Sequence, residues 1–320
     1  MNNMLEGRKG RGPAGHKIDK SLAVSFAGLV AVILLFELAS SGKLLTMRNL
    51  QAILNDGFMV IVGAIGVTFV VAQANLDLSI GGIMGVACFM GASAASLAPE
   101  FALPVALATG LLLGCVNALL CAKFRINSFI TTLAMQFVLK GMLIVLMNDG
   151  SLGLPYSMLT WDSSELKLIL LIVVAVAGYV VFEHMRMGKE IRAVGSNEEA
   201  ARQSGVKTKK IKAMGFIITG TLAGFVAFMS IIRTGTASTS SGAGFEFNAL
   251  MAVLLGGMPI TGGMNCRFRS AIIGGLTMAF LTNGMTMCGL DGEMQQLIKG
   301  IVFLAAVILT FDRKNLSVIK

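Results

Sequence analysis

The chain is poor in charged residues and in the side chains that most enzymes use. Only 13% of its 320 residues are Asp, Glu, Lys or Arg, while 55% are hydrophobic and the mean hydropathy is +0.79. These values exclude an ordinary soluble globular protein, in which about a quarter of the residues are charged. The two histidines, His16 and His184, lie in polar flanks, so neither a catalytic triad nor a zinc site is credible.

A phosphate-binding loop of the form GxxxxGK[ST] is also missing. The two Gly-Lys pairs, which begin at Gly42 and Gly188, are followed by Leu and Glu. The chain therefore cannot hydrolyse ATP by the usual P-loop route, and we expect no cofactor on it. The cysteines show no CxxC spacing and no nearby histidine, which favours apolar packing over a metal site or disulfide framework: Cys88, Cys115, Cys121, Cys266 and Cys288.

Apolar segments make up most of the sequence. A membrane-spanning helix needs about 20 mainly apolar residues, and the predicted fold class is an all-α polytopic membrane protein of about ten transmembrane helices. A basic start followed by an apolar run also fits a signal peptide, but its length and the many later spans favour a retained helix. The predicted spans are 21–40, 57–73, 80–98, 102–122, 127–147, 166–183, 213–232, about 245–260, 270–288 and 294–311.

The basic residues are unevenly divided between the loops. With ten spans, 20 of the 26 Lys and Arg residues fall on the side of the N-terminus. Because basic residues concentrate in cytoplasmic loops, we predict that both termini are cytoplasmic. The same rule explains the net charge of +9 without a nucleic-acid partner. The predicted organisation is a tail at 1–20, one transmembrane domain at 21–311 and a tail at 312–320.

The long polar interruption at 185–213 faces the cytoplasm in this topology. It contains a short predicted helix, with Ser196 as N-cap, Glu199 closing a capping box and Gly205 as the left-handed residue that ends it. A helix of about two turns is not stable alone in water. The segment is therefore either a well-capped solvated loop or a helix that packs on a partner.

The residues Asn75–Ser79 form a polar break between the second and third predicted spans. One interpretation is a broken helix whose irregular backbone lines a cavity, where such backbone is tolerated. The alternative is that Asp77 caps the third helix, with Ser79 as an equal candidate. Charged groups at membrane depth are otherwise few.

Four further polar residues lie near the predicted outer ends of spans. Lys140 and Lys299 either snorkel to the interface or contact substrate hydroxyls in an outward cavity. Glu246 and Asn248, beside two phenylalanines, suit either a cavity wall or a helix cap. GxxxG spacings, which are typical of close helix crossings, begin at three positions: Gly81, Gly110 and Gly220.

Five segments match one family's motifs in order, over residues 48 to 311. They are NLDLSIGG at 75–82, INSFITTL at 126–133, GKEIRAVGSNEEAARQSGV at 188–206, ALMAVLLGGMPITGG at 249–263, and Asn283-Gly284 with QQLIKG at 295–300. They resemble, in turn, GGIDLSVG, IPPFIVTL, GR-x-x-YAIGGNEEAARLSGI, AIAAVVLGGTSLxGG and the C-terminal motif of the permease subunits of ribose/xylose/galactose-type ABC importers. That family also includes branched-chain amino-acid permeases.

The resemblance implies a non-enzymatic permease in the bacterial inner membrane. Its implied partners are a second permease chain, a cytoplasmic ABC ATPase that holds ATP and Mg, and an extracytoplasmic sugar-binding protein. The residues expected to couple to the ATPase are Arg192, Ser196, Glu198, Glu199, Ala200, Ala201 and Gly205. Those expected along the translocation pathway or gate are Asn75, Asp77, Ser79, Asn127, Phe129, Lys140, Glu246 and Asn248.

Three short segments depart from the family's motifs, at 74–76, 127–128 and 264–266. There Ala-Asn-Leu replaces Gly-Gly-Ile, Asn-Ser replaces Pro-Pro, and Met-Asn-Cys replaces Arg-Gly-Ser. These departures leave open which sugar is moved and whether the second permease chain is identical. The main alternative function is an ion-coupled carrier with Asp77 as its proton site, and a passive channel is the third.

Overall fold

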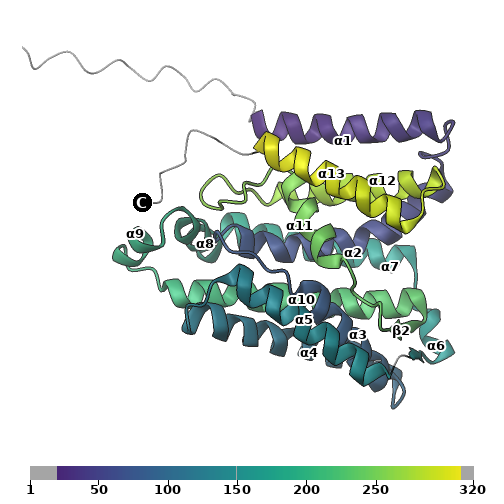
Figure 1. The fold of residues 1–320 in the computed structure, drawn as a ribbon, viewed down its shortest axis with the longest axis horizontal. Helices are drawn as coiled ribbons and strands as arrows, with labels where there is room; N and C mark the ends of the chain where they lie inside the picture. The colour runs from purple at the N-terminus through teal and green to yellow at the C-terminus, as the bar shows by residue number, and fades with distance from the viewer. Residues whose placement is uncertain (1–19, 149, 311–320) are drawn as a thin grey trace, which may run out of the picture.

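The computed structural model describes residues 20–148 and 150–310, and it is almost entirely helical (Figure 1). The predicted tails lie outside the described residues, apart from Lys20. The longer helices are α1 (Lys20–Ala39), α2 (Met47–Val71), α3 (Ile80–Ala95), α4 (Ala102–Ala118), α5 (Ser128–Met147), α7 (Ser164–Tyr179), α8 (Arg186–Ser196), α10 (Thr208–Thr234), α11 (Phe245–Leu255), α12 (Arg269–Met287) and α13 (Gly292–Thr310). The shorter elements are a 3-10 turn (Pro99–Phe101), α6 (Tyr156–Leu159), α9 (Glu198–Gln203) and two π-helical turns (Leu119–Lys123 and Val180–His184).

Each of the ten predicted spans coincides with a helix, but not every helix can cross a membrane alone. Six helices in the described part of the chain are long and apolar enough to do so. Helices α3 and α11 are apolar but have only 16 and 11 residues. At 1.5 Å per residue they are roughly 24 Å and 17 Å long, shorter than the ~30 Å hydrocarbon layer. The fold is that of a polytopic helical membrane protein, and the ten-span topology and its orientation stay predictions.

Helix α10 lies at the centre of the molecule and packs against α2, α3 and α4, while α12 packs against α2, α11 and α1. Most of α2 and α10 is buried, whereas α1 and α7 expose most of their side chains. The exposed side chains of α5 and α7 are large and apolar, including Val145, Ile172 and Val176. Such apolar outer faces suit contact with lipid rather than with water.

Helices α4 and α10 approach each other through glycines. A Cβ atom added to Gly110 would lie 2.2 Å from the carbonyl oxygen of Gly220, and one added to Gly224 would lie 2.3 Å from that of Ala106. No side chain fits in this space, so the two backbones are in contact. The GxxxG spacings that begin at Gly110 and Gly220 therefore do mark a close helix crossing, as their pattern indicated, and the structure shows that they face each other.

Helix α2 begins at Met47 rather than at residue 57, where the apolar span was predicted to start. Its first turns are polar, and neighbouring helices satisfy them. Asp56 forms an ion pair of 2.5 Å with Arg233 of α10, and the Asn49 amide donates to Asn283 of α12 at 2.8 Å. A count of apolar residues cannot detect a polar turn that is held by tertiary partners.

The predicted polar loop at 148–165 is more ordered than expected. It contains α6 and a strand β1 (Ser151–Gly153), which pairs antiparallel with β2 (Thr236–Ser238). This ribbon is a small addition to a fold that is otherwise helical, as predicted. Three-residue strands are too short to show the alternating pattern that predicts a strand.

The α4–α10 contact gives a testable prediction. We expect Gly110→Ala to lower the free energy of unfolding by about 1–3 kcal/mol, because the added methyl overpacks a backbone contact. Gly141→Ala is the matched control, since Gly141 also lies in a helix but has no atom within 4 Å of its added Cβ. Thermal unfolding in detergent measures both variants, and equal midpoints would contradict the packing argument.

Candidate functional site: a cavity between three helices and an exposed helix pair

Residues 72–79 join α2 to α3 as irregular chain inside the helical body. Side chains of α5 satisfy its backbone: Leu76 N donates to Ser128 Oγ at 3.2 Å, and Leu78 N donates to Thr132 Oγ1 at 3.1 Å. Buried amides need such partners, because an unsatisfied one costs free energy comparable to a lost hydrogen bond. The predicted break is therefore present, and α5 stabilises it.

Asp77 turns its carboxylate into this break. Its Oδ1 accepts from Ser79 N at 2.9 Å and from Ser79 Oγ at 2.6 Å, while Asn117 of α4 donates to Ser79 Oγ at 2.6 Å. All three side chains are buried. Ser79 precedes α3 but makes no side-chain cap bond to it. The geometry gives Asp77 a structural role at the start of α3.

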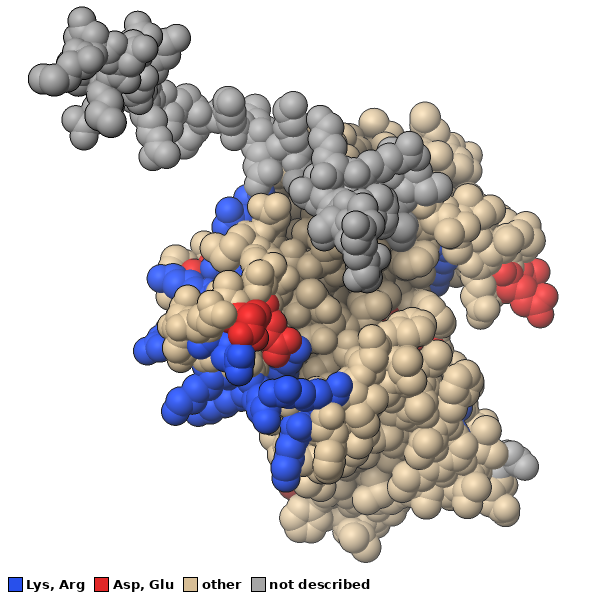
Figure 2. Space-filling view, turned by 60° about the vertical axis from the view of Figure 1, so that its left-hand side comes forward, with Lys and Arg blue, Asp and Glu red and all other residues tan. Residues whose placement is uncertain are grey.

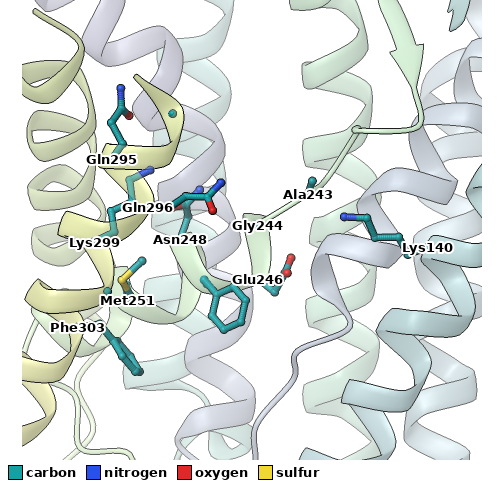
Figure 3. A pocket seen from close by; sticks show the side chains of 13 residues that line it. Lys140, Ala243, Gly244, Glu246, Asn248, Met251, Gln295, Gln296, Lys299 and Phe303 are labelled. Carbon is teal, nitrogen blue, oxygen red and sulfur yellow. The ribbon is translucent and has the colours of Figure 1, made fainter. Parts of the chain in front are cut away.

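A cavity of about 710 Å³ lies between α5, the start of α11 and α13 (Figure 3). The structure brings together three of the predicted pathway residues, Lys140, Glu246 and Asn248, and adds Lys299. The remaining lining residues are Ala243, Gly244, Phe247, Met251, Gly292, Gln295, Gln296, Gly300 and Phe303. Its size lies within the range of about 300–1,000 Å³ typical of small-molecule sites.

The lining of this cavity combines hydrogen-bonding groups with aromatic rings. Figure 3 shows the Lys140 amine directed from α5 toward α11, with Asn248 and Gln296 beside each other on the opposite side. Glu246 is buried, and its Oε2 has no hydrogen-bond partner among the described residues. Amines, amides and a carboxylate can together donate to and accept from a ligand rich in hydroxyls.

The sequence reasoning missed the two glutamines and Phe303 as cavity residues. Gln295 and Gln296 stand in the motif that precedes Lys299, so the signal was present, but their side-chain direction depends on how α13 packs beside α11. Helix α3 is joined to the α5 wall of the cavity by a hydrogen bond in which Gln136 Oε1 accepts from Gly82 N at 2.6 Å.

The other predicted pathway residues lie outside the cavity. Asn75, Asp77 and Ser79 belong to the break between α2 and α3. Asn127 is the N-cap of α5, where its Oδ1 accepts from Phe129 N at 3.0 Å, and the Phe129 side chain is exposed. Their part in translocation stays a prediction.

The polar segment at 185–213 forms two helices, α8 and α9, and the predicted cap is wrong. Helix α8 continues through Ser196, whose hydroxyl donates to Arg192 O at 3.1 Å. Asn197 is the N-cap of α9 instead, and its Oδ1 accepts from Ala200 N at 2.9 Å. Gly205 does adopt the predicted left-handed conformation, with φ of +86°.

Glu199 forms no capping box, because its carboxylate pairs with Arg202 at 2.5 Å within α9. The Arg202 guanidinium holds the pKa of Glu199 below its usual value. Glu198 joins α9 to α10 through an ion pair of 2.5 Å with Lys212. The short helix is thus held by charge pairs on two sides.

The coupling residues predicted from the sequence divide into exposed and buried groups. Ser196, Glu198, Glu199, Ala200 and Gly205 are exposed, whereas Arg192 and Ala201 are buried. Figure 2 shows Lys and Arg side chains gathered at this end of the molecule. The exposed basic residues of α8 and the start of α10 are Arg186, Lys189, Lys207, Lys209 and Lys210.

Comparison with known proteins decides the family. Residues 49–307 match the profile of a family described as the permease component of branched-chain amino acid transport systems. The chain belongs to this permease family. The resemblance inferred from the five motifs is confirmed.

Curated relatives cover most of this permease. The ribose import permease protein RbsC of Escherichia coli strain K12 is 30% identical over 88% of this chain and 91% of its own length. The RbsC protein of Bacillus subtilis strain 168 is 30% identical over 79% of this chain and 80% of its own length. The L-arabinose ABC transporter permease protein AraH of Azospirillum brasilense is 31% identical over 85% of this chain and 82% of its own length. No solved structure matches the permease.

The N-cap of α9 gives a second prediction. We expect Asn197→Ala to destabilise α9 by about 1 kcal/mol, because Ala200 N loses its acceptor. The amides of residues 198–203 should then exchange with deuterium roughly fivefold faster. Asn197→Asp retains a capping oxygen and is the matched control. If the alanine variant exchanges no faster than the aspartate variant, the assigned cap is wrong.

Proposed function

We propose that this permease moves a monosaccharide inward by alternating access, with ATP hydrolysed on separate ABC ATPase subunits. Family membership supports the permease role, and the names of the curated relatives, which include ribose, arabinose and fructose permeases, support a monosaccharide substrate. The sequence has no GxxxxGK[ST] motif, so a partner must supply the usual ATP-hydrolysing site.

The cavity between α5, α11 and α13 is the single observation that carries this proposal. Its polar groups suit sugar hydroxyls, and Phe247 or Phe303 offers an apolar face for the C–H side of a sugar ring. Glu246 and Lys140 lie on different elements, α11 and α5, so relative movement of these helices changes the distance between them. That is the property alternating access needs of a binding site.

The helix pair α8–α9 is the proposed contact for the ATPase. Its exposed residues present charges and a small Ala200 surface that allows close approach. The other proposed partners are a second permease chain and an extracytoplasmic binding protein that delivers the sugar, in the inner membrane of a bacterium. High affinity then resides in the binding protein, and the cavity needs only weak contacts.

Uptake by the assembled transporter tests the cavity. In proteoliposomes with the ATPase and binding protein, Glu246→Gln and Lys299→Met should each lower sugar uptake about tenfold or more, because a hydrogen bond to a charged group contributes about 1.5–3 kcal/mol. Lys43→Met, in the exposed turn between α1 and α2, is the control and should transport normally. Normal uptake by both cavity variants would refute the site.

An ion-coupled carrier is the second candidate, and one observation favours it. The buried Asp77 Oδ2 has no hydrogen-bond partner among the described residues, as expected for an oxygen that takes up a proton. A protonophore added while ATP is maintained separates the two functions. We expect uptake to continue in the presence of the protonophore, and to stop when the ATPase is inactivated. The opposite pair of results would favour the carrier.

A further inference from the structure

Helix α8 is fixed to the loop that joins α11 to α12, residues 256–268, which we call the α11–α12 loop. Glu183, in the π-helical turn that follows α7, makes the first connection. Its Oε2 accepts from the buried Arg192 of α8 at 2.6 Å, and its Oε1 accepts from Phe268 N in the loop at 2.9 Å. The Arg192 guanidinium also lies over the Phe182 ring, 5.2 Å from its centroid. One carboxylate therefore holds both segments.

Ser196, the last residue of α8, makes the second connection. Its Oγ accepts from Met264 N of the loop at 3.0 Å. The adjacent Gly263 N donates to Ala72 O, at the end of α2, also at 3.0 Å. A Cβ on Gly195 would lie only 2.0 Å from that same carbonyl oxygen. The end of α8, the loop and the end of α2 thus meet without an intervening side chain.

The α11–α12 loop leads directly to the wall of the cavity. Helix α11 begins with Glu246 and Asn248 in the cavity and ends where the loop starts. Two buried residues, Met258 and Phe268, anchor the loop in the interior. Close-packed protein interiors have low compressibility, so a displacement at one end of such a contact chain is transmitted to the other.

We propose that Glu183 and Ser196 are positioning residues for transport, which join α8 to the α11–α12 loop so that movement of the α8–α9 pair moves α11 and the cavity wall. This inference rests on the proposed function. Arg192, which the resemblance placed among the ATPase-coupling residues, then acts inside the chain, by holding Glu183 against the loop.

A reversible cross-link tests whether the connection is required. The 3.0 Å distance from Ser196 Oγ to Met264 N places the two Cα atoms within the ~7 Å that a disulfide spans. In the assembled complex, Ser196→Cys with Met264→Cys should transport several-fold more slowly than wild type when reduced, and recover when oxidised. A structural role alone predicts no recovery. Wild-type uptake in the reduced state, or a further loss on oxidation, would overturn the proposal.

Glu183→Gln tests the other connection. The variant still offers an oxygen to Phe268 N but loses the charge that pairs with Arg192. We expect basal ATPase activity to stay within twofold of wild type, while its stimulation by the sugar-loaded binding protein falls about tenfold. Glu190→Gln is the matched control, since Glu190 pairs with the exposed Arg186 of α8 and makes no hydrogen bond to the described residues of the loop. Equal stimulation of the two variants would contradict the assignment.

Hydrogen exchange of the purified chain tests the connection even if the transport proposal fails. In Glu183→Gln, amides of the α11–α12 loop and of α11 should exchange faster together, by about fivefold, while the same amides in Glu190→Gln should match wild type. Unchanged exchange in α11 would show that the loop does not transmit the disturbance, and would refute the inference independently of any uptake measurement.

Discussion

The structure depends on satisfying the backbone of residues 72–79 in the interior of a helical membrane protein. A helix satisfies its own amides, but an irregular segment needs partners, since each unsatisfied group in hydrocarbon costs several kcal/mol. Ser128 and Thr132 provide them from α5, and the Asp77–Ser79–Asn117 cluster joins the segment to α4. Helices α4 and α5 are thereby fixed to the interruption between α2 and α3, and Gly81 in the first turn of α3 lies against the cavity residue Glu246.

The same interruption lies near the helix pair α8–α9. Ala72 accepts from the α11–α12 loop, and Gln73 donates to Ile211 O at the start of α10. Helix α10 in turn packs against α4 through backbone contacts at the glycines of both helices. Because the contacts are between backbones, they leave little freedom for one helix to move without its neighbour. The fold is therefore suited to passing a movement at α8–α9 toward the cavity.

The helices were predictable from the sequence because apolar length is a local property. The glycine spacings of α4 and α10 indicated close helix crossings, although not which helices cross. The polar start of α2 was not predictable, since its ion pair with Arg233 joins residues far apart in the chain. The cap of α9 was misplaced by one residue: α8 extends through Ser196, whose hydroxyl bonds Arg192 O and Met264 N, and Asn197 caps α9 instead. Ser196 and Asn197 are both suitable N-cap residues, and the sequence alone does not show which of them caps α9.

The candidate site was predicted only in part, because some of its residues have a local sequence signal and others are brought to it by tertiary packing. Lys140, Glu246 and Asn248 stood out as polar residues in apolar surroundings, and the structure brings them to one cavity. Which of the remaining polar residues join them depends on the packing of α13 against α11. The Asp77 cluster has the same local signature as the cavity residues, yet it supports the chain rather than lining the cavity.

The central claim is that ATP-driven movement at α8–α9 reaches the cavity, and the accessibility of Asn248 tests it most directly. A cysteine placed by Asn248→Cys, with Cys288→Ser to remove an exposed native thiol, can be labelled by a membrane-impermeant reagent in the assembled complex. We expect the labelling rate to differ between the nucleotide-free and ATP-trapped states. Equal rates in the two states would contradict the account.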